Sequence, residues 1–110
     1  MDENANQEIR QLAFYEVHPG AIVKVLAAIE EFVTEIRIKQ PGALLYEVWQ
    51  ERDNPARFVH LFVFRDDAAH HAHVDAAETK KFASILYPEC LEPIKFVDYH
   101  QVATNAHPSL

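Results

Sequence analysis

The chain has 110 residues and a formal net charge of −7 with its histidines neutral, and 49% of its residues are hydrophobic. This length corresponds to one domain, and the apolar content is enough for a packed core. The acidic balance argues against binding to nucleic-acid phosphates or to anionic membranes, because both require clustered Lys and Arg side chains.

The N-terminal residues 1–9 are polar and acidic, and we expect them to form a disordered arm. They do not resemble a secretory signal peptide, and no apolar run approaches the roughly 20 residues of a membrane-spanning helix. Cys90 is the one cysteine, which excludes an internal disulfide and a Cys-rich zinc motif. These features predict a cytoplasmic protein with one domain over residues 10–103 and a loose tail over residues 104–110.

The first expected elements are a strand over residues 12–17 and a helix over residues 21–39. The strand segment, LAFYEV, is aromatic and β-branched and ends at the turn signal His18-Pro19-Gly20. In the helix, apolar residues recur at helical spacing and predict one buried face. Pro41-Gly42 ends the helix.

Two strands are expected next, over residues 44–50 and 58–64. Asn54-Pro55 favours a turn between them, so the two segments form a hairpin. The second segment, FVHLFVF, is almost continuously apolar, which is typical of a strand buried on both faces.

The last expected elements are two short helices, over residues 66–74 and 76–87, and a strand over residues 94–102. Asp66 or Asp67 is suited to cap the first of these helices, and Pro88 ends the second.

The resulting order, β-α-β-β-α-β, predicts an α+β fold of the ferredoxin-like type, with an antiparallel sheet and helices on one face. If the helices cover one face, something else must cover the other, because the strand over residues 58–64 is apolar on both. In a chain of this length, we expect that cover to be a second copy. The sequence therefore predicts a homodimer that packs sheet face to sheet face through an isologous interface.

Three histidines, His70, His71 and His73, lie close together in the first short helix and suggest a metal site. His70 and His73 share a helical face, whereas His71 is rotated from His70 by about 100°. Zinc and iron sites commonly take three or four ligands from separate elements. We therefore predict no metal site and expect His70 and His71 to be surface residues near the helix start.

Short motifs are spread from residue 18 to residue 82. They are HPG at 18–20, QPGAL at 40–44, RDNPARF at 52–58, RDDAA at 65–69, AH at 72–73 and KKF at 80–82. Their ordered set resembles the antibiotic biosynthesis monooxygenase family of dimeric α+β barrels. The resemblance implies that two ferredoxin-like subunits form an α+β barrel, and that each subunit has a pocket between its sheet and its helices.

The resemblance implies several possible activities, because fold alone does not fix function. The best-known family members oxidise aromatic polyketides or quinols with dioxygen and without metal or flavin, while others degrade haem or act on small signalling molecules. Ala13, Phe64 and Ala83 stand where the haem-degrading branch has Asn, Trp and His, so haem degradation is rejected. Phe62 and Phe64 also replace a Glu and a Trp that many oxygenase members carry.

Strand alternation and the resemblance together give the predicted site. The predicted substrate-binding residues are Tyr15, Tyr46, Phe58, Phe62, Phe64 and Phe82. His60 or His73 is the predicted base or hydrogen-bond partner, because a neutral imidazole is suited to deprotonating a phenol-like substrate. The alternatives are a His60 that is simply hydrogen-bonded in the core and a His73 that closes the short helix.

The sequence thus predicts a cofactor-independent monooxygenase that acts on a small aromatic substrate of the quinol or polyketide-phenol type. One alternative is an isomerase or degrader of a small carbonyl signalling compound. Another is a non-catalytic ligand-binding dimer, which the missing Trp and Glu favour. The expected partners are a second copy and a small aromatic ligand, with no nucleic acid, membrane, metal or cofactor.

Overall fold

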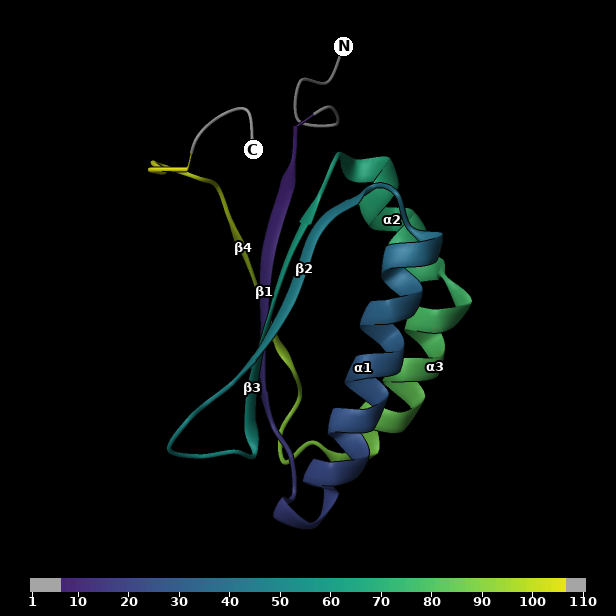
Figure 1. The fold of residues 1–110 in the computed structure, drawn as a ribbon, viewed down its shortest axis with the longest axis vertical. Helices are drawn as coiled ribbons and strands as arrows, with labels where there is room; N and C mark the ends of the chain where they lie inside the picture. The colour runs from purple at the N-terminus through teal and green to yellow at the C-terminus, as the bar shows by residue number, and fades with distance from the viewer. Residues whose placement is uncertain (1–6, 107–110) are drawn as a thin grey trace.

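The computed structural model describes residues 7–106 and shows an antiparallel sheet with its helices packed on one face (Figure 1). The elements are β1 (Ile9–Glu16), the 3-10 turn η2 (Pro19–Ala21), α1 (Ile22–Lys39), β2 (Ala43–Gln50), β3 (Arg57–Phe64), α2 (Asp67–Asp75), α3 (Ala77–Leu86), the 3-10 turn η3 (Tyr87–Glu89) and β4 (Lys95–Tyr99). The predicted α+β, ferredoxin-like order is confirmed. Within residues 7–106, no helix is both long and apolar enough to cross a membrane.

The sheet has the strand order β2-β3-β1-β4, so β3 and β1 are its central strands. All three neighbouring pairs are antiparallel. Ala13 of β1 pairs with His60 of β3 on one side and with Phe96 of β4 on the other. Since successive side chains alternate between the two faces of a strand, this register directs Ala13, His60 and Phe96 toward the helices.

The start of β1 and the bounds of β4 differ from the predicted ones. β1 begins at Ile9, before the predicted start at residue 12, because its ladder with β3 continues as far as the pair Ile9–Phe64. β4 covers only Lys95–Tyr99, because its pairing with β1 ends at Arg10–Tyr99. The proposed N-terminal arm and C-terminal tail lie largely outside the described residues.

The core lies between the inner face of the sheet and the helices α1 and α3 (Figure 1). The α1 residues Val25, Ile29, Phe32 and Ile36 are buried at the predicted helical spacing. Phe32 stacks on Phe82 of α3 with a ring-centroid distance of 4.4 Å and an interplanar angle of 11°. This stack holds the two helices together above the centre of the sheet.

The turn between α1 and β2 packs directly against the start of α2. The Gly42 carbonyl accepts a hydrogen bond of 2.8 Å from the Arg65 amide. A Cβ atom on Gly42 would lie only 2.5 Å from the Cβ of Ala69 in α2. Glycine is therefore required here for the close approach, which determines where α2 sits.

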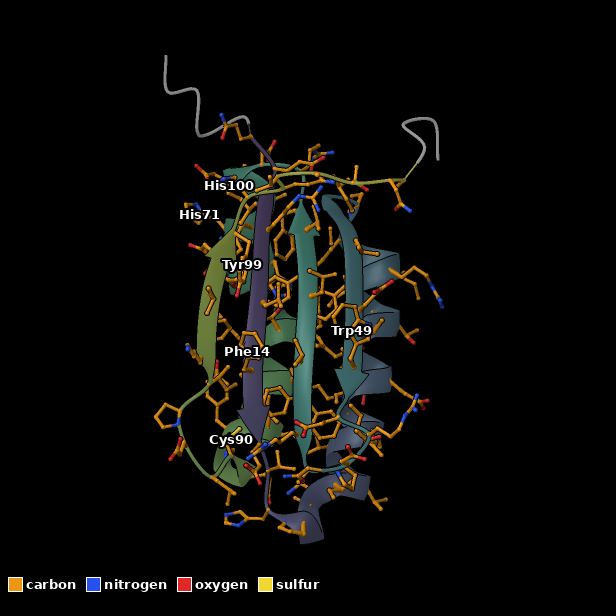
Figure 2. All side chains as sticks on the ribbon, turned by 90° about the vertical axis from the view of Figure 1, so that its left-hand side faces the viewer. Phe14, Trp49, His71, Cys90, Tyr99 and His100 are labelled. Carbon is orange, nitrogen blue, oxygen red and sulfur yellow. The ribbon has the colours of Figure 1, made fainter. Side chains whose placement is uncertain are left out.

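The outer face of the sheet carries no helix of the described chain, and Figure 2 shows Phe14, Trp49 and Tyr99 on this face. Trp49 and Tyr99 are 50% and 51% exposed. Leu45 of β2, which lies on the same face by strand alternation, is 40% exposed. Exposed large apolar side chains on a contiguous face commonly mark an interaction surface.

Candidate functional site

A buried histidine on β3 is held between two tyrosines from the neighbouring strands. His60 is 2% exposed. Its Nε2 lies 2.7 Å from the hydroxyl oxygen of Tyr15 on β1, and its Nδ1 lies 2.9 Å from that of Tyr46 on β2. The three side chains meet because β3 is paired with both of the other strands and all three project from the helix-facing side.

The burial of His60, Tyr15 and Tyr46 determines which of them carry protons at pH 7. Burial, and to a smaller extent the nearby His73, lowers the pKa of His60 to about 3, so the imidazole is neutral at pH 7. Burial raises the pKa of Tyr15 and Tyr46, so both phenols keep their protons.

A neutral imidazole has one N–H donor and one acceptor nitrogen. One tyrosine therefore donates its O–H to His60, while the other accepts the His60 N–H and keeps its own O–H for a further acceptor. The cluster thus offers one phenolic donor that the hydrogen bonds to His60 do not use.

A second buried histidine, His73 of α2, lies close to this cluster. It is 6% exposed, and its Nδ1 lies 2.8 Å from Oε1 of Gln40. Burial and the neighbouring His70 lower the pKa of His73 to about 4, partly opposed by Glu78. Its Nε2 has no hydrogen-bond partner within residues 7–106. His73 therefore has one ring nitrogen committed to the protein and one available for a ligand.

Both histidines border a cavity of about 70 Å³ between the sheet and the helices. The cavity is lined by Ala13, Tyr15, Phe32, Tyr46, His60, Phe62, His73, Thr79, Phe82, Ala83, Leu86, Tyr87, Ile94 and Phe96. The hydroxyl of Thr79 is buried without a hydrogen-bond partner in the described part of the chain. This volume holds about two or three water molecules. It is well below the roughly 300 Å³ of the smaller ligand pockets, so an aromatic ligand requires side-chain movement.

One side of the cavity adjoins a hollow on the molecular surface. Tyr87, Ile94 and Phe96 line both the cavity and an adjoining surface hollow of about 460 Å³ between η3 and β4. Tyr87 and Phe96 are 56% and 52% exposed. The side chains that separate the cavity from solvent are thus themselves at the surface, where rotation is least restricted.

The predicted site residues divide into two groups. Tyr15, Tyr46, His60, Phe62, His73 and Phe82 all line the cavity, as sequence reasoning placed them. Phe58 and Phe64 lie on the expected face of β3 but do not line it, and they are 1% and 0% exposed. Phe58 stacks on Tyr15 at 5.5 Å between ring centroids, and Phe64 lies 4.8 Å from His73. These two rings support cavity residues from behind.

Sequence reasoning missed Gln40, Thr79, Tyr87 and Phe96. Gln40 begins the QPGAL motif, so its position was noted, but nothing in the motif indicates its contact with His73. Thr79 lies on the face of α3 that carries Phe82, three residues along the helix, which is a usable signal. Tyr87 and Phe96 border the cavity only because η3 and β4 converge there.

The other two histidines of α2 take no part in the cavity. His71 is exposed as expected, but His70 is half-buried, with its ring 5.3 Å from that of Phe64. Burial and His71 lower the pKa of His70, with Asp98 and Asp67 opposing. Asp66 caps the helix by accepting a hydrogen bond of 2.9 Å from the Ala69 amide. Within the described ranges, no group of three or more His, Cys, Asp or Glu residues is arranged to hold a metal ion.

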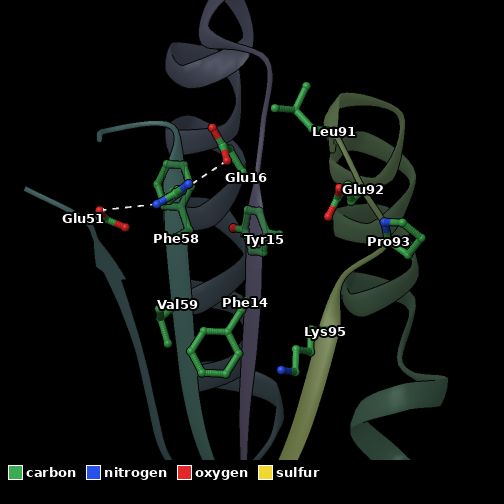
Figure 3. A pocket seen from close by; sticks show the side chains of 11 residues that line it. Phe14, Tyr15, Glu16, Glu51, Phe58, Val59, Leu91, Glu92, Pro93 and Lys95 are labelled. Carbon is green, nitrogen blue, oxygen red and sulfur yellow. Dashed lines mark hydrogen bonds and ion pairs between the residues drawn. The ribbon is translucent and has the colours of Figure 1, made fainter. Parts of the chain in front are cut away.

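A larger groove of about 520 Å³ lies near the ends of β1 and β3 (Figure 3). Its most prominent charged group, Arg57, pairs with Glu16 at 3.1 Å and with Glu51 at 3.8 Å. Such solvent-exposed ion pairs contribute little to stability. The smaller cavity is the better candidate because it gathers buried titratable groups with strongly shifted pKa values.

Comparison with known proteins gives matches over most of the chain. The model of the family described as antibiotic biosynthesis monooxygenase matches residues 8–84. A proposed antibiotic biosynthesis monooxygenase from Bacteroides thetaiotaomicron has a TM-score of 0.85 at 17% identity, over 94% of this chain and 97% of that one. A proposed member from Nitrosomonas europaea has a TM-score of 0.79 at 21% identity, over 88% and 92% of the two chains.

A protein from Shewanella oneidensis has a TM-score of 0.76 at 26% identity, over 87% of this chain and 92% of that one. None of the curated proteins gives a significant match. The solved structures thus share the fold over nearly their whole length.

Proposed function

The chain belongs to the antibiotic biosynthesis monooxygenase family, and from that premise we propose that it is a cofactor-independent monooxygenase of a small aromatic substrate. The substrate is of the quinol or polyketide-phenol type. The observation that carries the proposal is one aromatic-lined cavity that contains a free imidazole nitrogen and an uncommitted phenolic O–H. Once side chains move to enlarge its volume of about 70 Å³, such a site is suited to a flat ring with oxygen substituents.

The proposed reaction begins with a proton transfer. The substrate hydroxyl gives its proton to Nε2 of His73, and the resulting phenolate accepts a hydrogen bond from the tyrosine O–H. The electron-rich anion passes one electron to dioxygen, and the two radicals combine to form a carbon–oxygen bond. The peroxide anion takes back the proton held by Nε2 of His73 and becomes a hydroperoxide on a ring carbon that still carries a hydrogen. This hydroperoxide loses water, so one oxygen atom remains as a new carbonyl, the other leaves as water, and His73 is neutral again.

The hydrogen bonds of the two histidines decide which one is the base. Nε2 and Nδ1 of His60 are both bonded to tyrosine hydroxyls, so His60 has no lone pair free for a substrate. His73 has one, but its pKa of about 4 is low. A phenol of ordinary pKa near 10 would transfer its proton uphill by about 8 kcal/mol. The transfer is feasible only if imidazolium and phenolate stay in contact, because their attraction is several kcal/mol once the substrate displaces water from the cavity.

Assembly belongs to the same proposal. We propose that the protein works as a homodimer in which the outer sheet face, with Phe14, Leu45, Trp49 and Tyr99, packs against its copy. Exposure of these residues in the isolated subunit supports the arrangement. In the dimer, the sheets would close the α+β barrel while each cavity stays on its own helix side.

The test is oxygen uptake with a panel of hydroquinones and anthrones. We expect His73→Phe to lower the turnover number by about 10²- to 10⁴-fold, because the ring volume is retained while the base is lost. His71→Phe on the same helix is the control and should retain activity, since His71 is exposed. Equal oxygen uptake by the wild type and His73→Phe would refute His73 as the base. Tight binding of a flat ligand with no oxygen uptake would support a non-catalytic binding protein.

A further inference from the structure

A chain of hydrogen bonds connects His73 to a carboxylate outside the cavity. Nε2 of Gln40 donates a hydrogen bond of 2.9 Å to Oε2 of Glu78 in α3, and Oε1 of Gln40 lies 2.8 Å from Nδ1 of His73 in α2. Gln40 is the C-cap residue, directly after the end of α1. The chain therefore joins all three α-helices at the edge of the site.

The chemistry of the three groups fixes the direction of every bond in this chain. The hydrogen bond from Gln40 lowers the pKa of Glu78, so Glu78 is an ionised carboxylate and only accepts. The amide NH₂ of Gln40 must then face Glu78, which turns the amide oxygen toward His73. An amide oxygen also only accepts, so Nδ1 of His73 must carry the proton. The neutral ring consequently keeps its lone pair on Nε2.

The backbone makes this arrangement rigid. The amide of Gln40 donates to the Ile36 carbonyl at 2.9 Å, and its carbonyl accepts from the Ala43 amide at 3.0 Å. The adjacent Gly42 holds the same turn against α2, the helix that carries His73. Gln40 does not line the cavity, so it acts on a bound molecule only through His73.

We propose that Gln40, oriented by Glu78, is a positioning residue that holds His73 in its Nδ1–H tautomer and presents Nε2 to the substrate as a proton acceptor. This inference rests on the proposed function where it names a substrate proton, although the tautomer itself does not depend on it. A substrate must then bring a free hydroxyl to Nε2 and an acceptor oxygen to the tyrosine O–H. A methyl ether at the first position loses the hydrogen bond and the proton that the reaction requires.

The direct test is the nitrogen-15 NMR spectrum of His73 in the full-length protein at pH 7, assigned by its loss in His73→Phe. We expect the Nδ1–H pattern in the wild type and a large fraction of Nε2–H in Gln40→Leu, which removes the acceptor. Glu78→Gln should also give a mixture, because the Gln40 amide can then face either way. Glu35→Gln is the matched control. Glu35 lies in α1 and accepts a hydrogen bond from Lys39 of the same helix, so this variant should leave the tautomer of His73 unchanged.

A double variant that exchanges the amide and the carboxylate between positions 40 and 78 gives a stronger test. In the double variant Gln40→Glu with Glu78→Gln, the new amide donates to the new carboxylate, which again accepts from Nδ1. We expect this variant to restore the Nδ1–H tautomer that Glu78→Gln loses. If the proposed oxidation also holds, Glu78→Gln lowers kcat in proportion to the fraction of His73 rings in the Nε2–H form, with little change in KM, and the swap recovers it.

The outcomes separate the two proposals. An Nε2–H wild type, or a Gln40→Leu variant that keeps a pure Nδ1–H ring, overturns the role of Gln40. A wild type with the Nδ1–H ring and the expected response to the variants, but without oxygen uptake, supports the positioning role and overturns only the oxidation.

Discussion

The side chains of Tyr15, His60 and Tyr46 show how three polar residues can occupy an aromatic core. Both ring nitrogens of His60 and both hydroxyls are used in two short contacts, so the imidazole is satisfied while remaining neutral. An unpaired buried polar group would cost about 1–3 kcal/mol. Because both of its ring nitrogens are bonded, His60 has no lone pair free to act as a base. Its contacts instead orient the two tyrosine hydroxyls.

The buried histidines make stability depend on pH. The pKa values of His60 and His73 in the folded protein, about 3 and about 4, lie below the usual 6.5. The unfolded chain therefore binds more protons than the folded protein below pH 6.5, and stability falls as the pH falls. Each histidine contributes about 1.4 kcal/mol per pH unit between its unfolded and folded pKa values.

We expect the free energy of unfolding to be flat with respect to these groups above pH 7 and to decrease by roughly 2–3 kcal/mol per unit between pH 6 and pH 5. Urea denaturation across that range measures the slope. His73→Phe should reduce it by about half, because one of the two groups is gone. A slope that His73→Phe leaves unchanged would contradict the assignment.

At the scale of elements, the turn between α1 and β2 has the most consequence for the site. It ends α1 at Gln40 and brings Gly42 against Ala69 of α2. The two helices are held at the spacing that the contact between Gln40 and His73 requires. A change in this turn therefore acts on the site without touching the cavity.

Substitution of the two glycines tests this contact. Gly42→Ala should destabilise the protein by about 1–3 kcal/mol, because its Cβ would lie 2.5 Å from that of Ala69. Gly20→Ala is the control: no atom lies within 4 Å of its added Cβ, so the free energy of unfolding should change by less than about 1 kcal/mol. Thermal or urea unfolding of the two variants measures the difference. Equal stability of the two would mean that α2 adjusts freely.

The sequence predicted the elements because their patterns are local. The apolar spacing in α1 and the turn signals predicted the elements, and alternation along β3 divided its residues into two sets. The family resemblance then assigned the set with His60 and Phe62 to the helix-facing side, where both residues line the cavity. The ends of β1 and β4 were not predictable, because they depend on where their partner strands stop. The contact between Gln40 and His73 joins residues far apart in sequence and depends on how closely a turn approaches a helix.

At the scale of the whole molecule, one layer of helices covers one face of the sheet, and the opposite face carries exposed apolar residues (Figures 1 and 2). Trp49 lies on β2 with half of its surface exposed. A tryptophan buried in a protein interface can contribute about 2 kcal/mol, roughly a thirtyfold change in affinity.

We expect the wild type to sediment as a dimer and Trp49→Lys to weaken that dimer by tenfold or more, because a charge would be buried in an apolar interface. Val23→Lys on α1 is the control, since Val23 is 81% exposed on the helix side of the molecule. Sedimentation equilibrium over a range of concentrations measures both. A monomeric wild type would refute the dimer.

Strand β3 gives alternate residues to two surfaces: His60 and Phe62 line the cavity, while Val59 and Leu61 face the proposed interface. A displacement of this strand that accompanies ligand entry would therefore also change the surface offered to the second copy. Thermodynamic linkage makes such an effect reciprocal: whatever factor a ligand adds to the association constant of the dimer, association must add to the affinity for that ligand. An aromatic ligand's dissociation constant would then depend on protein concentration, even though the ligand touches only one subunit.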